Sequence, residues 1–173
     1  MRGSVEPISG HGRASPRLRQ TLNLGLQPSC KDAMKTVVLI DNDEEFRESL
    51  RSVLEHHGLE VLDSSCPQSA FQELQAIDKP DLILCELHMP FAVGDDAGDY
   101  KVSYEVGLKT LQELAWVYPG TPVVALTELN QLDLARIKKY LDPIPAYHKP
   151  ESALEVIPLV EGYLHSREWG GVQ

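Results

Sequence analysis

The sequence predicts an α/β fold in which helices cover both faces of a parallel sheet of five strands. Two observations predict it. Short apolar runs recur five times along the chain, and each is followed by a segment whose apolar residues have helical spacing. Such runs are typical of strands buried on both faces, and their strict alternation with helices requires right-handed crossover connections. The expected architecture is therefore a three-layer, doubly wound parallel sheet.

The first strand and helix set the pattern. Residues 37–40 are a β-branched apolar run, which the polar residues 41–43 end. Residues 44–57 have acidic side chains at the start and Gly58 after the end, which favours a helix. The other strands are expected at 59–62, 82–85, 123–126 and 146–148. The other helices are expected at 67–77, 108–118, 133–141 and 152–165, where Pro158 predicts a kink or a late start for the last one.

Composition limits the class of protein. The formal net charge of −10 over 173 residues argues against nucleic acid as a main partner, because binding phosphate backbones needs clustered Lys and Arg. The sequence has no apolar run long enough for a membrane-spanning helix, so we expect no membrane contact. The 3 cysteines are odd in number and widely spaced, which fits a reduced, cytoplasmic protein better than a disulfide framework.

The expected domain runs from residue 34 to residue 166. Residues 1–33 are rich in Gly, Ser, Pro and Arg and have no apolar periodicity, so we expect a disordered extension. Two alternatives are an organelle transit peptide and an upstream extension of a reading frame that begins at Met34. Residues 167–173 are expected to form a tail. Since no output domain follows, we expect output through protein–protein contact.

Polar residues stand where the predicted strands end. They are Asp41, Asn42 and Asp43 after the first strand, Glu86 after the third, Thr127 after the fourth and Lys149 after the fifth. Because the carboxyl ends of parallel strands meet at one edge of the sheet, these side chains would converge there. Carboxylates, a hydroxyl and an ammonium group together suit a cation or a phosphoryl group.

The stretches VVLIDND, DLILCELHMP, VVALT and HKP resemble the receiver domain of bacterial response regulators. The spacing of 45 residues from Asp41 to Glu86 and of 22 from Thr127 to Lys149 is as that family has it. The resemblance implies a flavodoxin-like sheet with strand order 2-1-3-4-5. It also implies a site in which an Asp after the third strand accepts a phosphoryl group from a histidine kinase. An acidic pair after the first strand then holds Mg²⁺, and Thr127 and Lys149 read the phosphate.

Two positions depart from the family pattern. Glu86 stands at the acceptor position, and its carboxylate extends one bond further, about 1.5 Å. In-line phosphoryl transfer depends on accurate placement, so we expect Glu86 to be a poor acceptor that can still pair with Lys149 and imitate part of the active state. Asn42 replaces the second acid, which weakens a Mg²⁺ site and leaves Asp41 and Glu86 as its candidate ligands.

The resemblance also points to a switch region and an insertion. The family's aromatic switch position is Ala146; Tyr147 is its neighbour, but alternation along a strand aims Tyr147 at the other face. The segment 91–106 is longer than the corresponding family loop. It is either a lid or binding element beside the pocket or a solvated surface loop.

Each candidate residue has an alternative structural role. Helix capping is the alternative for Asp41 and Thr127, a turn for Asn42, a helix-start acid for Asp43 and a structural ion pair for Glu86 with Lys149. A lysine directly before a proline is harder to explain by packing, which favours a role for Lys149 in the site.

The sequence favours a stand-alone, atypical receiver that is not an enzyme and that signals by binding a histidine kinase or an effector, without an aspartyl-phosphorylation cycle. The expected contact face, also available to a homodimer, joins the fourth helix, fifth strand and fifth helix (133–141 and 152–164). The alternative is a phosphorylatable single-domain response regulator in a two-component phosphorelay. A flavodoxin-like small-molecule binder is disfavoured, because the acidic run DNDEEF would repel a flavin phosphate.

Overall fold

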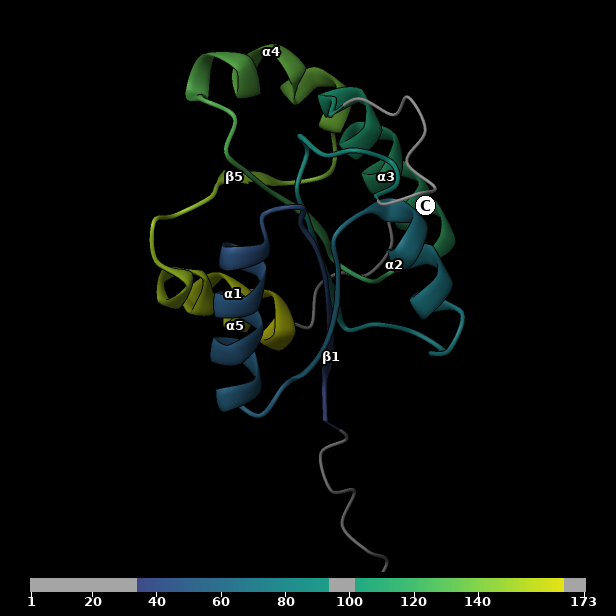
Figure 1. Cartoon of the computed structure of the whole chain (residues 1–173), viewed down its shortest axis with the longest axis vertical. Coiled ribbons are helices and arrows are strands. Elements are labelled where there is room, and N and C mark those ends of the chain that lie inside the picture. Colours follow the sequence, from purple (N-terminus) through teal and green to yellow (C-terminus); the bar gives the residue numbers. More distant parts are fainter. Residues whose placement is uncertain (1–33, 94–101, 167–173) are drawn as a thin grey trace, which may run out of the picture. The chain divides into compact units, whose positions relative to one another are not determined.

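The computed structural model describes residues 34–93 and 102–166, and it contains the predicted five-stranded sheet (Figure 1). The strands are β1 (Thr36–Ile40), β2 (Glu60–Ser64), β3 (Leu82–Cys85), β4 (Val123–Thr127) and β5 (Ala146–His148). Their order is β2-β1-β3-β4-β5, and every pairing is parallel. The predicted fold class and strand order are therefore confirmed. The expectations for residues 1–33, for 94–101 of the insertion and for 167–173 lie outside the described residues.

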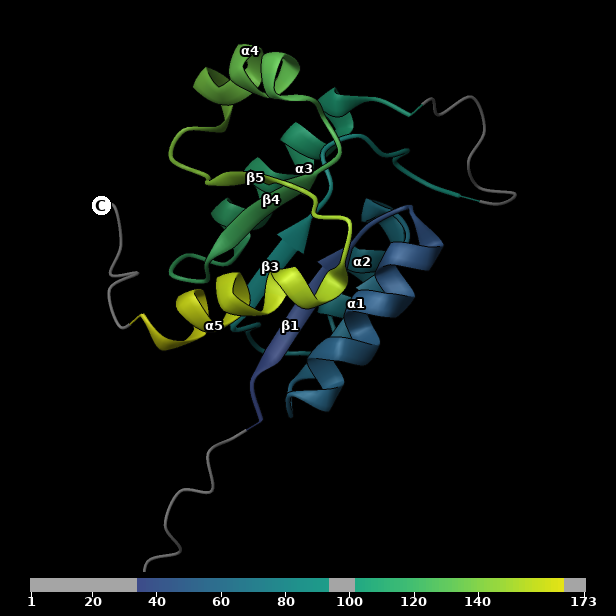
Figure 2. The same ribbon diagram turned by 90° about the vertical axis from the view of Figure 1, so that its left-hand side faces the viewer.

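Helices cover the sheet on both faces (Figure 2). They are α1 (Glu44–His56), α2 (Pro67–Leu74), α3 (Tyr104–Val117), α4 (Gln131–Leu141) and α5 (Ile157–His165), with a short 3₁₀ helix, η2 (Ala153–Val156), before α5. Helices α1 and α5 pack on one face of the sheet, while α2, α3 and α4 pack on the other. Within the described residues, no helix has the length and apolar character needed to cross a bilayer.

Alternate residues of β1 enter the two cores. Val37 and Leu39 pack against α1 and α5, whereas Val38 and Ile40 pack on the opposite side with α2 and α3. All four side chains are buried, which explains why the strand reads as a continuous apolar run rather than as an alternating one.

Several helix boundaries differ from the prediction. Helix α3 begins at Tyr104 rather than at Leu108, because Ser103 caps it by accepting a hydrogen bond from the Glu105 N–H at 3.1 Å. The end of the predicted insertion is therefore helical. Helix α4 likewise begins before Asp133, with Asn130 as its cap, and α2 ends at Leu74 rather than at residue 77. Pro158 lies in the first turn of α5, so the last helix starts late.

A glycine sets the distance between α3 and the loop that follows β3. A Cβ atom on Gly107 would overlap the backbone of Leu87 and lie 2.6 Å from its carbonyl carbon. Leu87 directly follows Glu86, so this close approach holds the loop that carries the candidate acceptor. Gly162 in α5 has no atom within 4 Å of the corresponding position.

We predict that Gly107→Ala lowers the free energy of unfolding by about 1–3 kcal/mol, because a methyl group there would push α3 away from the Leu87 backbone. The matched variant Gly162→Ala should raise it by about 0.5–1 kcal/mol, since alanine favours helix and meets open space. Urea unfolding followed by circular dichroism measures both. Equal effects of the two substitutions would contradict the close approach.

Candidate functional site

The predicted polar residues meet at the carboxyl edge of the sheet because the strands end in register. Ile40 of β1 pairs with Cys85 of β3, so Asp41 and Glu86 follow at the same level. The Glu86 N–H donates to the Ile40 carbonyl at 2.8 Å, which anchors the start of the loop. The Lys149 N–H donates to the Thr127 carbonyl at 2.7 Å in the same way. The four side chains that converge are all buried: Asp41, Glu86, Thr127 and Lys149.

Both carboxylate oxygens of Glu86 accept hydrogen bonds. Its Oε1 accepts from the Leu87 N–H at 2.7 Å, from the His88 N–H at 3.0 Å and from the Thr127 hydroxyl. Its Oε2 accepts from the Glu128 N–H at 3.2 Å and lies 3.3 Å from the Lys149 Nζ. Five donors therefore surround a side chain that is 3% exposed. This fits the rule that a buried charge must be paired and hydrogen-bonded.

The ammonium group of Lys149 lies among acidic side chains. Its Nζ is close to Asp41 (2.8 Å), Glu86 (3.3 Å), Glu128 (3.6 Å) and Asp43 (3.9 Å). Burial by itself lowers the pKa of Lys149, but the hydrogen bond to Asp41 and the attraction of the surrounding carboxylates outweigh it and raise the pKa. The side chain is therefore a buried, protonated cation.

Two residues of this environment were not predicted as part of the site. Glu128 directly follows Thr127, so its place after a strand was a signal available in the sequence. Phe46 was expected only as an inward residue of the first helix, but the Lys149 Nζ lies 4.6 Å from its ring centroid. An aromatic face favours a nearby cation, so Phe46 adds to the stabilisation of the ammonium.

Asp41 is the acid most affected by burial. It is 1% exposed, and burial raises its pKa to about 6 from an ordinary value of 3.8. Three interactions oppose this rise in the pKa: the hydrogen bond from Lys149, the attraction of its positive charge, and the hydrogen bond from the Asp43 N–H, which lies 2.9 Å from Oδ1. The negative charge of the nearby Glu86 adds to the rise. A single ammonium is thus shared between two buried carboxylates.

The other two residues after β1 lie differently. Asn42 is exposed. Asp43 is the N-cap of α1, because its Oδ1 accepts a hydrogen bond from the Phe46 N–H at 3.2 Å. Asp43 therefore has the helix-start role given above as its alternative, and it approaches Lys149 only at the edge of the site.

The site residues do not fit the Mg²⁺ ion that the family resemblance implies. Both oxygens of Glu86 already accept hydrogen bonds, and the Lys149 Nζ bridges Glu86 and Asp41. Among the residues that the structure describes, no group of three or more His, Cys, Asp or Glu side chains is arranged to hold a metal ion. These side chains form instead a buried ion pair in which Lys149 contacts both Asp41 and Glu86.

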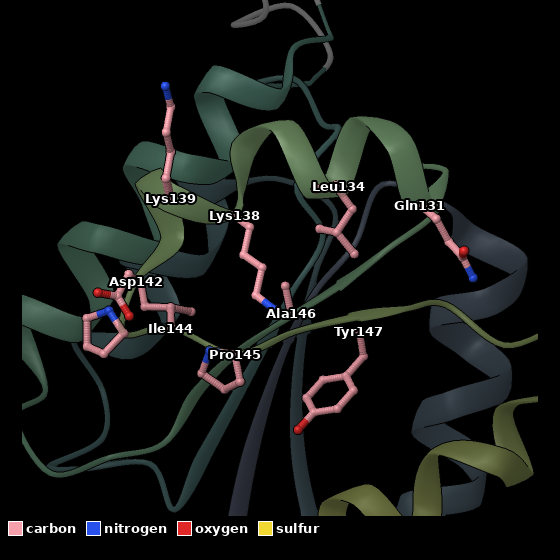
Figure 3. A pocket seen from close by; sticks show the side chains of 11 residues that line it. Gln131, Leu134, Lys138, Lys139, Asp142, Ile144, Pro145, Ala146 and Tyr147 are labelled. Atoms are coloured by element: carbon pink, nitrogen blue, oxygen red, sulfur yellow. The ribbon is translucent and has the colours of Figure 1, made fainter.

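The switch region lies beside a groove formed by α4, β5 and the segment between them (Figure 3). Ala146 packs against the core on the α4 side. Tyr147 points the other way, and its hydroxyl lies 3.0 Å from that of Tyr163 on α5. The groove has a volume of about 960 Å³, and Lys138 extends into it while Lys139 extends away (Figure 3). Ala146, the residue at the predicted switch position, is among the residues that line this groove.

We predict that Asp41 makes stability depend on pH. Because its pKa is about 6 when folded and near 3.8 when unfolded, ionising it costs stability above pH 6 and nothing below pH 3.8. The Asp41→Asn variant should therefore gain stability relative to wild type as the pH rises between these values. Urea unfolding across that range measures the difference. Glu161→Gln, which removes an exposed carboxylate, is the control, and a constant or falling difference for Asp41→Asn would contradict the prediction.

Comparisons with known proteins agree with the fold. The sequence model of the response regulator receiver domain matches residues 37–143. Transcriptional regulatory protein PdtaR of Mycobacterium tuberculosis is 29% identical over 125 residues, which cover 72% of this chain and 54% of PdtaR. The probable transcriptional regulator ycf29 of Cyanophora paradoxa is 29% identical over 133 residues, or 76% of this chain and 57% of that protein. The chain thus spans about half the length of these curated relatives.

Solved structures share the fold. The CheY-like response regulator receiver domain protein from Methanospirillum hungatei JF-1 matches with a TM-score of 0.62 at 17% identity, over 80% of this chain and 100% of that chain. A response regulator from Thermotoga maritima matches with a TM-score of 0.59 at 20% identity, over 78% of this chain and 100% of that one. Because the family match runs from β1 through α4 and includes Asp41, Glu86 and Thr127, the chain belongs to the response regulator receiver domain family.

Proposed function

We propose that this is an atypical receiver in which the Glu86 carboxylate permanently takes the place of a phosphoryl group. Signalling then passes through protein–protein contact, without an ordinary aspartyl-phosphorylation cycle. One observation carries the proposal: the Thr127 hydroxyl and the Lys149 ammonium, the two groups that read the phosphate in the family, both contact the Glu86 carboxylate.

The chemistry of the carboxylate supports an imitation that is partial. Glu86 carries one negative charge on two oxygens, whereas a phosphorylated group carries about −1.5 to −2 and offers three acceptor oxygens. The longer glutamate side chain compensates by bringing its carboxylate to Thr127 and Lys149. It thus makes contacts like those of a phosphoryl group, but with less charge.

The same hydrogen bonds disfavour Glu86 as an acceptor. A carboxylate oxygen must have a free lone pair to attack a phosphoryl donor in line. A carboxylate has about four lone-pair sites, and five donors surround Glu86. Phosphoryl transfer would therefore require several buried hydrogen bonds to break first.

A short chain of contacts joins Glu86 to α4. The Thr127 hydroxyl donates to Glu86, and the Thr127 Oγ1 accepts from the Leu129 N–H at 3.2 Å. Leu129 directly precedes Asn130, the N-cap of α4. The position of Thr127 therefore affects where α4, the helix that borders the groove, begins. We propose the face of α4, β5 and α5 as the docking surface for a protein partner.

We predict that wild-type protein incubated with acetyl phosphate and Mg²⁺ gains no phosphoryl group, as measured by intact mass spectrometry. The reason is the saturated, displaced carboxylate of Glu86. The Glu86→Asp variant should gain a phosphoryl group in part, because its shorter side chain restores the acceptor geometry of the family.

Two controls complete this experiment. The double variant Glu86→Asp with Asn42→Asp restores the second acid as well and should gain more phosphoryl group than Glu86→Asp alone. Glu86→Gln has no nucleophilic carboxylate at this position. A mass gain in wild type that disappears in Glu86→Gln would contradict the proposal and support the phosphorelay function instead.

A further inference from the structure

We infer that Lys149 is the resident cation of this pocket and that its ammonium group excludes divalent metal ions from the wild-type site. This goes beyond the proposed function, because it concerns which cation balances the acids and not whether Glu86 accepts phosphate. The two can fail separately.

The first observation is the place of the ammonium. The Lys149 Nζ lies 2.8 Å from Asp41 Oδ2, 3.1 Å from Asp41 Oδ1 and 3.3 Å from Glu86 Oε2. Its side chain is 5% exposed, and the ring of Phe46 lies beside the Nζ at 4.6 Å. The position between the two buried carboxylates, where a shared metal ion would have to lie, is thus held by a covalently attached cation.

The second observation is that the oxygens of the pocket have donors already. Besides Lys149, the Asp41 Oδ1 accepts from the Asp43 N–H at 2.9 Å. Glu86 accepts from three backbone N–H groups and from Thr127. The lone pairs that these donors leave on Asp41 Oδ2 and Glu86 Oε2 face the Lys149 ammonium, which lies where a metal ion would need to bind.

The third observation concerns the geometry that Mg²⁺ requires. This ion demands near-ideal octahedral coordination at about 2.0–2.1 Å and usually keeps several waters. The two inner acids are buried and the Lys149 ammonium lies between them, so Mg²⁺ could reach their oxygens only by displacing that ammonium. The other two acids near Lys149 are outer ones, because the side chain of Asp43 is 39% exposed and that of Glu128 is 65% exposed.

Loss of the ammonium should change the cation preference of the pocket. Without it, two buried carboxylates and two outer ones would face one another with no balancing charge, which is strongly unfavourable. A divalent cation supplies that charge. We therefore expect Lys149→Gln to acquire a divalent metal site that wild type lacks.

The test is titration with Mn²⁺ alone, followed by the electron paramagnetic resonance signal of the free ion. Wild type should leave the signal unchanged, and so should Lys138→Gln, which removes an exposed lysine of α4. Lys149→Gln should deplete the signal, with an affinity at least about tenfold above that of wild type. Added Mg²⁺ should restore the signal by competition.

Three results would overturn the inference. One is binding of Mn²⁺ by wild type that is lost in Glu86→Gln, which would place a metal beside Lys149. Another is a folded Lys149→Gln protein that binds no more Mn²⁺ than wild type. If Lys149→Gln is unfolded without metal, circular dichroism should show folding as Mn²⁺ is added, and failure to fold at saturating Mn²⁺ is the third.

Discussion

One buried ammonium group shared by two buried carboxylates is the interaction on which the polar edge of this domain depends. Lys149 comes from the end of β5, and Asp41, 108 residues earlier, from the end of β1. Removing one member of such a group leaves an uncompensated buried charge, which is far costlier than losing an exposed ion pair. The strand ends are therefore held together by charge as well as by the backbone ladder.

The contacts around Glu86 concern two separate properties of a receiver site: its ability to accept a phosphoryl group, and the conformation that a bound phosphoryl group stabilises. In the proposed function, Thr127 and Lys149 make with Glu86 the contacts that they would otherwise make with a phosphoryl group. In the proposed function the resulting conformation is permanent, so that regulation depends on the supply of a partner and on its access to the groove beside α4. The charge balance of the pocket then needs no ion from solution.

The fold was predictable because its causes are local. Each strand is a short apolar run, and the polar residues that end the strands lie at one edge once the strands are parallel. The start of α3 was not predicted, although Ser103 and Glu105 carry an N-terminal helix signal. The segment 91–106 was interpreted as one insertion because of its length. The close approach of Gly107 to Leu87 joins residues from different elements, and no local pattern indicates it.

The sequence by itself determined the parallel sheet and the set of polar residues at its edge, because periodicity and strand alternation are properties of neighbouring residues. The strand order followed from the resemblance to the receiver family and not from periodicity. Only the tertiary structure decided how those residues share their charges. It placed Asp43 as a helix cap, left Asn42 exposed and brought Glu128 and Phe46 to Lys149. The physical reason is that hydrogen-bond saturation and desolvation depend on which atoms meet from distant elements, and spacing along the chain does not contain that information.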